Sequence, residues 1–341
     1  MKYLKKFENE EAKNAWLNGS EYVTPNVALT KGVVEYNLFS HGYATLPLYV
    51  EAIDESIYIK FKNDYEYSRD NSTWLSGNKD TSISADVGEK VYFRATGLTI
   101  DSRYGIGSFN ISSGKCKVGG NIMSMAFGAD FKGKYAILSG HQFTCLFMAC
   151  AAIVDASELV LPATTLTDGC YSSLFQNCSY LENAPKLPAK SLAKGCYIGM
   201  YSGCTRLKSA PELPAMTLAD ECYYSMFRNC TSLVAAPELP ATTLAEQCYQ
   251  EMFTGCINIE TAPVLPALTL TKWCYKMIFL GCPKLNYIKM MATDISAIYC
   301  LDSWVDGVAA SGTFVKNSAA TWDVVGTSGI PGNWTIETAE S

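Results

Sequence analysis

The cysteines of this chain are the residues whose type and spacing most suggest chemistry. In the second half they come in pairs eight residues apart, such as Cys222 and Cys230, and each pair recurs after 26 residues. Thiols at fixed spacings are the groups that form disulfides or bind zinc. Ten cysteines keep this pattern: Cys170, Cys178, Cys196, Cys204, Cys222, Cys230, Cys248, Cys256, Cys274 and Cys282.

Neither disulfide nor zinc chemistry fits this spacing. If a pair lies on one helix, its residues are about 12 Å apart along the axis, whereas bridged Cα atoms lie within about 7 Å. Equivalent cysteines on neighbouring packed helices would be about 8–10 Å apart. A spacing of eight without a nearby histidine also matches no ordinary zinc pattern. We therefore predict buried, reduced thiols that act as small core residues, and no metal site.

Other groups that could do chemistry are scarce. The chain has two histidines, His41 and His141, and neither has neighbours that indicate a catalytic triad. We predict no catalytic residues and no cofactor. The formal net charge of -6 offers no basic field to a nucleic acid. No apolar run reaches the roughly 20 residues of a membrane-spanning helix, so we expect neither a nucleic-acid partner nor membrane insertion.

The repeated unit contains the phrase CYYSMFRNC at 222–230 and four close copies of it. Cys222 and Met226 lie four residues apart, as do Tyr223 and Phe227, which is the spacing of one helix face. A short, proline-marked extended segment follows. Each unit is thus predicted as one helix and one extended segment. The predicted helix ends in a residue type that tolerates the left-handed conformation, namely Asn177, Gly203, Asn229, Gly255 or Gly281.

A fixed period in the twenties is typical of a solenoid, because one unit cannot bury its apolar stripe alone. We predict a solenoid domain over 121–300, with regular repeats from about 161. Residues 141–162 keep part of the phrase but carry two extra residues, which indicates an atypical first coil. Beyond Cys300 the pattern decays, and 301–341 is predicted to be a closing cap. Three tryptophans are available to cover its last open face: Trp304, Trp322 and Trp334.

The first half of the chain shows the alternation of half-buried strands. Apolar and polar residues alternate over 57–61 and again over 91–95. With polar, turn-rich links between them, these strands predict a small antiparallel β-sandwich over 41–120. Residues 1–40 form a leader, with a short helix at 8–18, that is too short for a core of its own. The predicted fold class is therefore α+β, with a leader, a sandwich, a solenoid and end caps.

At two positions of the repeat the residue type varies from copy to copy, while the rest of the unit stays the same. We call each set of equivalent positions a column; such variation is expected where side chains face solvent or a specific partner. We predict the two columns as ligand-binding candidates, and a merely solvated face is the alternative. The tyrosine after each first cysteine is predicted to pack in the core or at its edge rather than against sugars. The first column is Ser172, Ile198, Tyr224, Gln250 and Lys276, and the second is Glu182, Lys208, Val234, Glu260 and Asn286.

The repeats, such as CYYSMFRNCTSLVAAPELPATTLA, resemble the BspA-type leucine-rich repeat proteins of gut bacteria and their phages. The flanks GNIMSMAFG at 120–128, SGTFVKN at 311–317 and SGIPGNWTI at 328–336 share this likeness, which covers roughly 45–341. It implies a right-handed α/β leucine-rich-repeat solenoid, an adhesive or binding role, and no catalytic residues. The leader MKYLKKFENEEAKNAWLNGSEYVTPNVAL resembles the N-termini of virion proteins of crAss-like and related phages. Exported family members carry a signal peptide, which this sequence does not show, so the phage expectation is favoured.

We therefore expect a non-enzymatic virion protein, a head or tail fibre or decoration subunit. Its leader would bind neighbouring virion subunits, and its solenoid would bind a host-surface glycan or protein. One alternative is a bacterial cell-surface, extracellular BspA-like adhesin. Another is a hydrolase of surface polymers, for which no carboxylate pair stands out. The sequence is compatible with a homo-oligomer, although no heptad seam indicates one.

Overall fold

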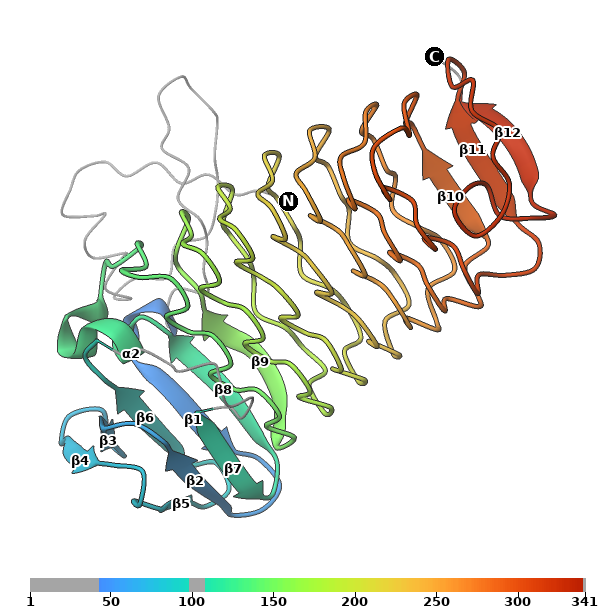
Figure 1. Ribbon diagram of the computed structural model, residues 1–341. Coiled ribbons are helices and arrows are strands. Elements are labelled where there is room, and N and C mark those ends of the chain that lie inside the picture. The colour runs from blue at the N-terminus through green and yellow to red at the C-terminus, as the bar shows by residue number, and fades with distance from the viewer. Residues whose placement is uncertain (1–42, 98–107, 340–341) are drawn as a thin grey trace, which may run out of the picture.

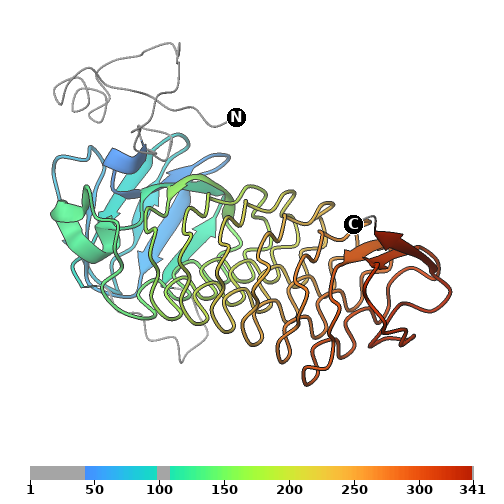
Figure 2. The ribbon, with the colours of Figure 1, turned by 90° about the horizontal axis from the view of Figure 1, so that it is seen from above.

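The protein is described here by a computed structural model that covers residues 43–97 and 108–339 (Figure 1). The predicted leader and its helix at 8–18 lie outside these residues. Helical elements in the described part are short: η1 (Tyr43–Thr45), α2 (Ser124–Phe127) and η3 (Gly128–Phe131). Figures 1 and 2 show an elongated molecule, with sheets at one end followed by a row of stacked repeats. The described chain therefore consists mainly of strands and turns.

Residues 48–121 and 153–160 form two sheets. One has the strand order β4-β3-β6-β1-β8-β9, and the other has the order β5-β2-β7. Neighbouring strands are antiparallel, except that β8 and β9 are parallel. The strands are β1 (Leu48–Ala52), β2 (Ile57–Phe61), β3 (Tyr65–Ser68), β4 (Leu75–Gly77), β5 (Ile83–Ala85), β6 (Lys90–Arg94), β7 (Phe109–Ser113), β8 (Cys116–Asn121) and β9 (Ile153–Val160).

The two sheets pack against each other through the buried side chains of their alternating strands. In β2, Ile57, Ile59 and Phe61 are fully buried, and the residues between them are exposed, which confirms the predicted alternation. The ring of Phe109 on β7 lies 5.1 Å from the ring of Phe93 on β6, across the space between the sheets. Burying a large apolar side chain contributes about 1.5–3 kcal/mol. The facing apolar surfaces therefore hold the two sheets together.

The six-stranded sheet continues into the repeats through β9. The carbonyl of Val154 accepts the N–H of Glu182 at 2.9 Å, and the N–H of Ala156 donates to the carbonyl of Asn183 at 2.9 Å. The segment before β9 is bonded to the first regular repeat in the same way, as in Phe143 N–H to the carbonyl of Cys170 at 2.9 Å. Main-chain hydrogen bonds thus attach the stack to the sheets.

The CYxxMFxxC phrase is a run of turns, so the helix predicted in each repeat is wrong. Alternate N–H groups donate within the repeat and to the next repeat. The N–H of Cys222 donates to the carbonyl of Ala219 at 3.2 Å, whereas the N–H of Tyr223 donates to the carbonyl of Cys248 at 3.0 Å. An α-helix would use every N–H within its own segment. Here half of them hold neighbouring repeats together.

Every fourth residue of this run is left-handed. The φ angle is 58° at Glu221, 52° at Ser225 and 58° at Asn229. The left-handed conformation predicted before each second cysteine is therefore confirmed, although it belongs to a turn and not to a helix end. The turns also bring the repeats closer than packed helices would. The main chains of neighbouring repeats are joined directly, as by Tyr223 N–H to the carbonyl of Cys248 at 3.0 Å, whereas the axes of packed helices lie about 8–10 Å apart.

Two columns of stacked aromatic rings run through the core of the repeats. One column follows the tyrosine after each first cysteine, and the other follows the aromatic residue four positions later. In the second column the rings of Phe227 and Phe253 are 5.8 Å apart and almost parallel, at 3°. A single repeat could not bury these rings, so the stack itself creates the core.

The stack ends in a small parallel sheet and three tryptophans. Trp304 is fully buried, its ring lies 6.4 Å from that of Phe279, and its Nε1–H donates to the carbonyl of Gly329 at 2.8 Å. Trp322 and Trp334 also donate their Nε1–H groups to main-chain carbonyls, each at 2.8 Å. The sheet has the order β10 (Tyr287–Met290), β11 (Thr313–Asn317) and β12 (Thr335–Ala339).

Candidate functional site

The ten repeat cysteines lie in the core as free thiols. The second cysteine of each repeat donates its S–H to a main-chain carbonyl of the preceding repeat, as from Cys230 to Tyr201 at 3.2 Å and from Cys256 to Phe227 at 3.0 Å. Burial raises the pKa of Cys222 to about 12. Thiolates are the reactive and metal-binding form of cysteine, so thiols of this kind serve as packing groups at neutral pH.

The two histidines are not brought together with other reactive groups in the described chain. His41 lies outside the described residues. His141 stands at the start of the stack, where its N–H donates to the carbonyl of Asp168 at 2.8 Å and its Nδ1 lies 3.5 Å from the hydroxyl of Thr144. Within 43–97 and 108–339, no three His, Cys, Asp or Glu side chains gather in a way that could hold a metal ion.

The first variable column forms a continuous row along the turns. The carbonyl of Tyr224 accepts the N–H of Gly199 at 2.8 Å, and the carbonyl of Lys276 accepts the N–H of Glu251 at 2.9 Å. The row continues beyond the predicted column to Asp302, whose carbonyl accepts the N–H of Met277 at 2.9 Å. Gln250 is buried, whereas the other predicted members are partly buried: Ser172, Ile198, Tyr224 and Lys276.

One side chain of this row, that of Tyr224, is bonded to a residue of the next repeat that lies beside the row. The carboxylate of Glu251 accepts from the Tyr224 hydroxyl at 3.1 Å, from Ser225 at 3.3 Å and from Arg228 at 2.8 Å. Because the Glu251 side chain is only 13% exposed, this network lies partly beneath the surface. Hydrogen bonds to a charged group are stronger than those between neutral groups. The Tyr224 hydroxyl is therefore used in a hydrogen bond between repeats and is not directed toward a partner.

The second variable column forms a separate row that is more open to solvent. Glu182 and Lys208 make an ion pair between neighbouring repeats. Val234 is 64% exposed, and Glu260 and Asn286 are exposed as well. Among the described residues, main-chain bonds and ion pairs link members within a column and do not join one column to the other. The structure thus produces two rows and no single site that combines them.

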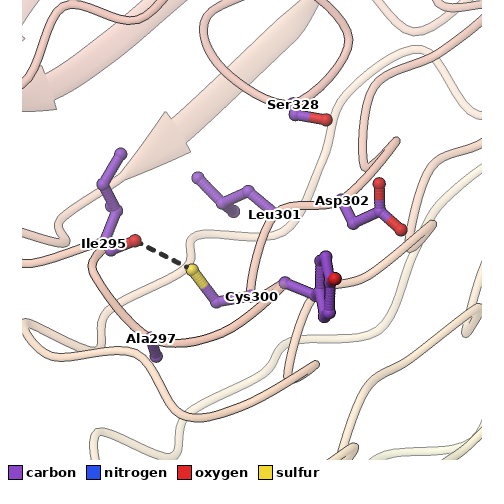
Figure 3. A pocket seen from close by; sticks show the side chains of 7 residues that line it. Ile295, Ala297, Cys300, Leu301, Asp302 and Ser328 are labelled. Atoms are coloured by element: carbon purple, nitrogen blue, oxygen red, sulfur yellow. Dashed lines mark hydrogen bonds between the residues drawn. The ribbon is translucent and has the colours of Figure 1, made fainter.

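A pocket of about 200 Å³ lies where the first row ends (Figure 3). Figure 3 shows Leu301, Asp302 and Ser328 among the side chains that line it. The Cys300 thiol donates to the carbonyl of Ile295 at 3.1 Å. The carboxylate of Asp302 is paired with Lys276 at 3.1 Å. The full lining is Ile295, Ala297, Tyr299, Cys300, Leu301, Asp302 and Ser328. This pocket combines apolar surface, an exposed aromatic residue, a carboxylate and a hydroxyl.

The aromatic residue of the pocket occupies a backbone position that is left-handed in every regular repeat. Tyr299 has a φ of 52° and Trp273, its equivalent in the preceding repeat, has a φ of 58°. Gly169 and Gly195 hold the same position in earlier repeats, each with a φ of 60°. Left-handed backbone suits glycine and disfavours bulky side chains. The last repeats therefore place large aromatic side chains where the first repeats have none.

Sequence reasoning missed Tyr299, Asp302 and Ser328 as members of a site. A signal was present, because Asp302 lies 26 residues after Lys276, and Ser328 lies 26 residues after Asp302. The cysteine phrase decays after Cys300, so the predicted column ended at Lys276. The 26-residue spacing of the first column thus continues beyond the last copy of the CYxxMFxxC phrase.

Comparison of the chain with protein-family models, with curated proteins and with solved structures found no match. Among the residues that the structure describes, no helix has the length and apolar character that crossing a bilayer requires.

Proposed function

We propose that this chain is a non-enzymatic virion structural and binding protein, namely a head or tail fibre or a decoration subunit. Its repeats display a surface that attaches to a host-cell glycan or protein, and residues 1–40 bind neighbouring virion subunits. The likeness of the repeats to BspA-type proteins, and of the leader to crAss-like virion proteins, supports this proposal. The alternative location is a bacterial cell surface, where the same surface would serve an adhesin.

One observation carries the proposal: the variable columns lie in register along a hydrogen-bonded stack. Side chains that differ at each step are held over a core that stays the same, as at Tyr224 and Lys276 in the first row. An extended, repetitive surface suits a large partner better than a small substrate. The stacked rings and main-chain bonds also fix the distance between successive side chains, which favours recognition of an extended ligand.

In finer detail, we propose that the stack is a right-handed leucine-rich-repeat solenoid with end caps, joined to the sandwich as a spacer. A leucine or isoleucine is fully buried at the same position after the second cysteine of each repeat: Leu181, Leu207, Leu233, Ile259 and Leu285. A run of turns takes the place that the resemblance assigns to a helix. The long axis seen in Figure 2 would carry the binding surface away from the anchored end.

Deleting residues 1–28 tests the anchoring role of the leader. We expect the truncated chain to remain folded and soluble but to be absent from purified particles. A full-length control, Val234→Ser, changes one exposed side chain of the second row and should enter particles normally. Normal incorporation of the truncated chain would contradict the anchoring role.

Surface labelling of intact, uninfected host cells distinguishes the virion protein from the adhesin. A virion protein should not be labelled on these cells. Strong labelling of the full-length chain there would instead support a bacterial adhesin with the same binding surface.

A further inference from the structure

We propose that the pocket at the end of the first row binds one neutral pyranose ring, such as the terminal residue of a host-surface glycan. The inference rests on the proposed attachment function and assigns a class of ligand to it. The pocket volume of about 200 Å³ is below the roughly 300–1,000 Å³ of sites for drug-sized ligands. It therefore suits a single sugar ring better than an oligosaccharide chain.

The polar groups of the pocket match the hydroxyls of a sugar. The Oγ of Ser328 accepts the N–H of Ser303 at 3.1 Å, and its own O–H proton is available to donate. The carboxylate of Asp302 accepts hydrogen bonds, and the Lys276 ammonium beside it donates them. In this ion pair the Lys276 side chain is 25% exposed and the Asp302 side chain 34%, so a ligand can reach both. Adjacent sugar hydroxyls, each a donor and an acceptor, satisfy such a set.

The apolar part of the pocket suits the C–H face of a pyranose. Tyr299 is 62% exposed, so most of its side chain is free to contact a ligand. The Nζ of Lys276 lies 5.8 Å from the centroid of the Tyr299 ring. One small molecule can therefore contact both that ring and the Lys276–Asp302 ion pair. Amphipathic aromatic side chains contribute large contact area and retain a polar end. One sugar ring can therefore contact the ring of Tyr299 and the Asp302 carboxylate together.

The backbone at Tyr299 fixes where its side chain lies on the surface. Its φ of 52° is one that glycine adopts without cost, as Gly169 and Gly195 do at the same position of earlier repeats. A large side chain in this conformation is disfavoured. Tyr299 does not recover that cost through burial, since it is largely exposed. The same turn carries Glu221, Gln247 and Trp273 in other repeats, so the conformation follows from the fold, and what distinguishes Tyr299 is its exposed ring beside the pocket.

The charges at the pocket favour an uncharged sugar. Asp302 and Lys276 neutralise each other at a distance of 3.1 Å, so no unpaired cation remains to hold a carboxylate or a sulfate. The pair has no net charge, so it offers a negatively charged sugar no attraction to offset the cost of removing that charge from water. The pocket thus discriminates by hydrogen bonding and ring contact.

Saturation-transfer NMR on the full chain tests the assignment, with the methyl glycosides of galactose, glucose, mannose and N-acetylglucosamine as probes. A shallow site for one ring should bind with a Kd of about 1 mM. Tyr299→Gly removes the ring where glycine suits the backbone, so the variant should stay folded. Binding should weaken by about tenfold or more in Tyr299→Gly and in Asp302→Asn. Tyr135→Ala, which removes an exposed tyrosine near the first repeat, should bind like the unaltered protein.

Saturable binding of a neutral glycoside that both pocket variants weaken would support the assignment. It would be overturned if no neutral glycoside showed saturation transfer, or if Tyr299→Gly bound as tightly as the unaltered protein. Binding of N-acetylneuraminic acid in place of the neutral probes would also overturn it. Particle incorporation is measured separately, so failure at the pocket and failure of the virion role can be told apart.

Discussion

Replacing Tyr201 by phenylalanine should stabilise the protein. Tyr201 is fully buried, and its hydroxyl has no hydrogen-bond partner. Burial also raises the pKa of this hydroxyl well above its usual value, so it stays neutral. The neighbouring repeats carry Phe175 and Phe227 at this position, and their rings stack on Tyr201 at 5.9 and 5.6 Å. The change therefore removes one unpaired oxygen from a column that already accommodates phenyl rings.

The expected gain follows from the cost of an unpaired buried hydroxyl, which is about 1–3 kcal/mol. The free energy of unfolding of Tyr201→Phe should rise by about this amount, because the stacking contacts on both faces of the ring are retained. The reciprocal change, Phe227→Tyr, places an unpaired hydroxyl in the same column. It should lower the free energy of unfolding by a similar amount.

Urea denaturation measures both effects as shifts of the midpoint at unchanged slope. Tyr135→Phe, at an exposed tyrosine, is the matched control and should leave the midpoint where it is. An unchanged or lower midpoint for Tyr201→Phe, with a native near-UV spectrum, would show that the unpaired hydroxyl carries no such cost. So would a Phe227→Tyr variant as stable as the unaltered protein.

Three further predictions concern the repeats. Glu251→Ala should lower the free energy of unfolding by about 1–3 kcal/mol, because three donors lose a mostly buried carboxylate. Glu182→Ala, which loses an exposed ion pair, should lower it by less than about 1 kcal/mol. Equal losses of the two variants in urea denaturation would contradict this. The fourteen cysteines, all buried and free, should resist a thiol reagent in the native protein and react fully in denaturant, and fast native labelling of Cys222 would count against the packing. Burial raises the pKa of Cys222 and Cys282 to about 12 from an ordinary 9.0. Stability should therefore be retained below about pH 9 and fall as the pH rises toward 12; a urea midpoint that rises over this range would have the wrong sign.

The strands of the first half and the columns of the second could be predicted from the sequence. The apolar–polar alternation over 57–61 predicted which side chains of β2 are buried and which are exposed, because a period of two residues is the period of a strand. The 26-residue period likewise placed equivalent residues beside one another, as seen for Tyr223 and Tyr249. The parallel pairing of β8 with β9 was not predicted, since it joins two regions that the sequence patterns treat separately.

The helix in each repeat was wrongly predicted because a spacing of four residues fits two structures. Cys222, Met226 and Cys230 lie at a strict period of four, whereas the 3.6-residue period of a helix drifts from four to three within two turns. A run of turns with a left-handed residue every fourth position keeps the period. The second repeat carries this signal openly, with glycine at 195, 199 and 203.

The pocket was not predicted from the sequence, and the binding role of the two columns stays a prediction. The first column was recognised by its variation from repeat to repeat. Its continuation to Asp302 and Ser328 was not recognised, because the CYxxMFxxC phrase is not kept after Cys300. The pocket depends on the loop that carries Ser328, which bonds to Ser303 across 25 residues of the closing segment. No local pattern predicts that contact. The left-handed Tyr299 could have been found only by comparing it with Gly169 and Gly195 in the same column.

Quantitative mass spectrometry of purified phage particles and of washed host-cell surfaces tests the central functional claim most directly. We expect peptides of this chain in the particles at an abundance comparable to other structural subunits. Peptides found on uninfected cells and not in particles would contradict the virion role and assign the repeat surface to a bacterial adhesin.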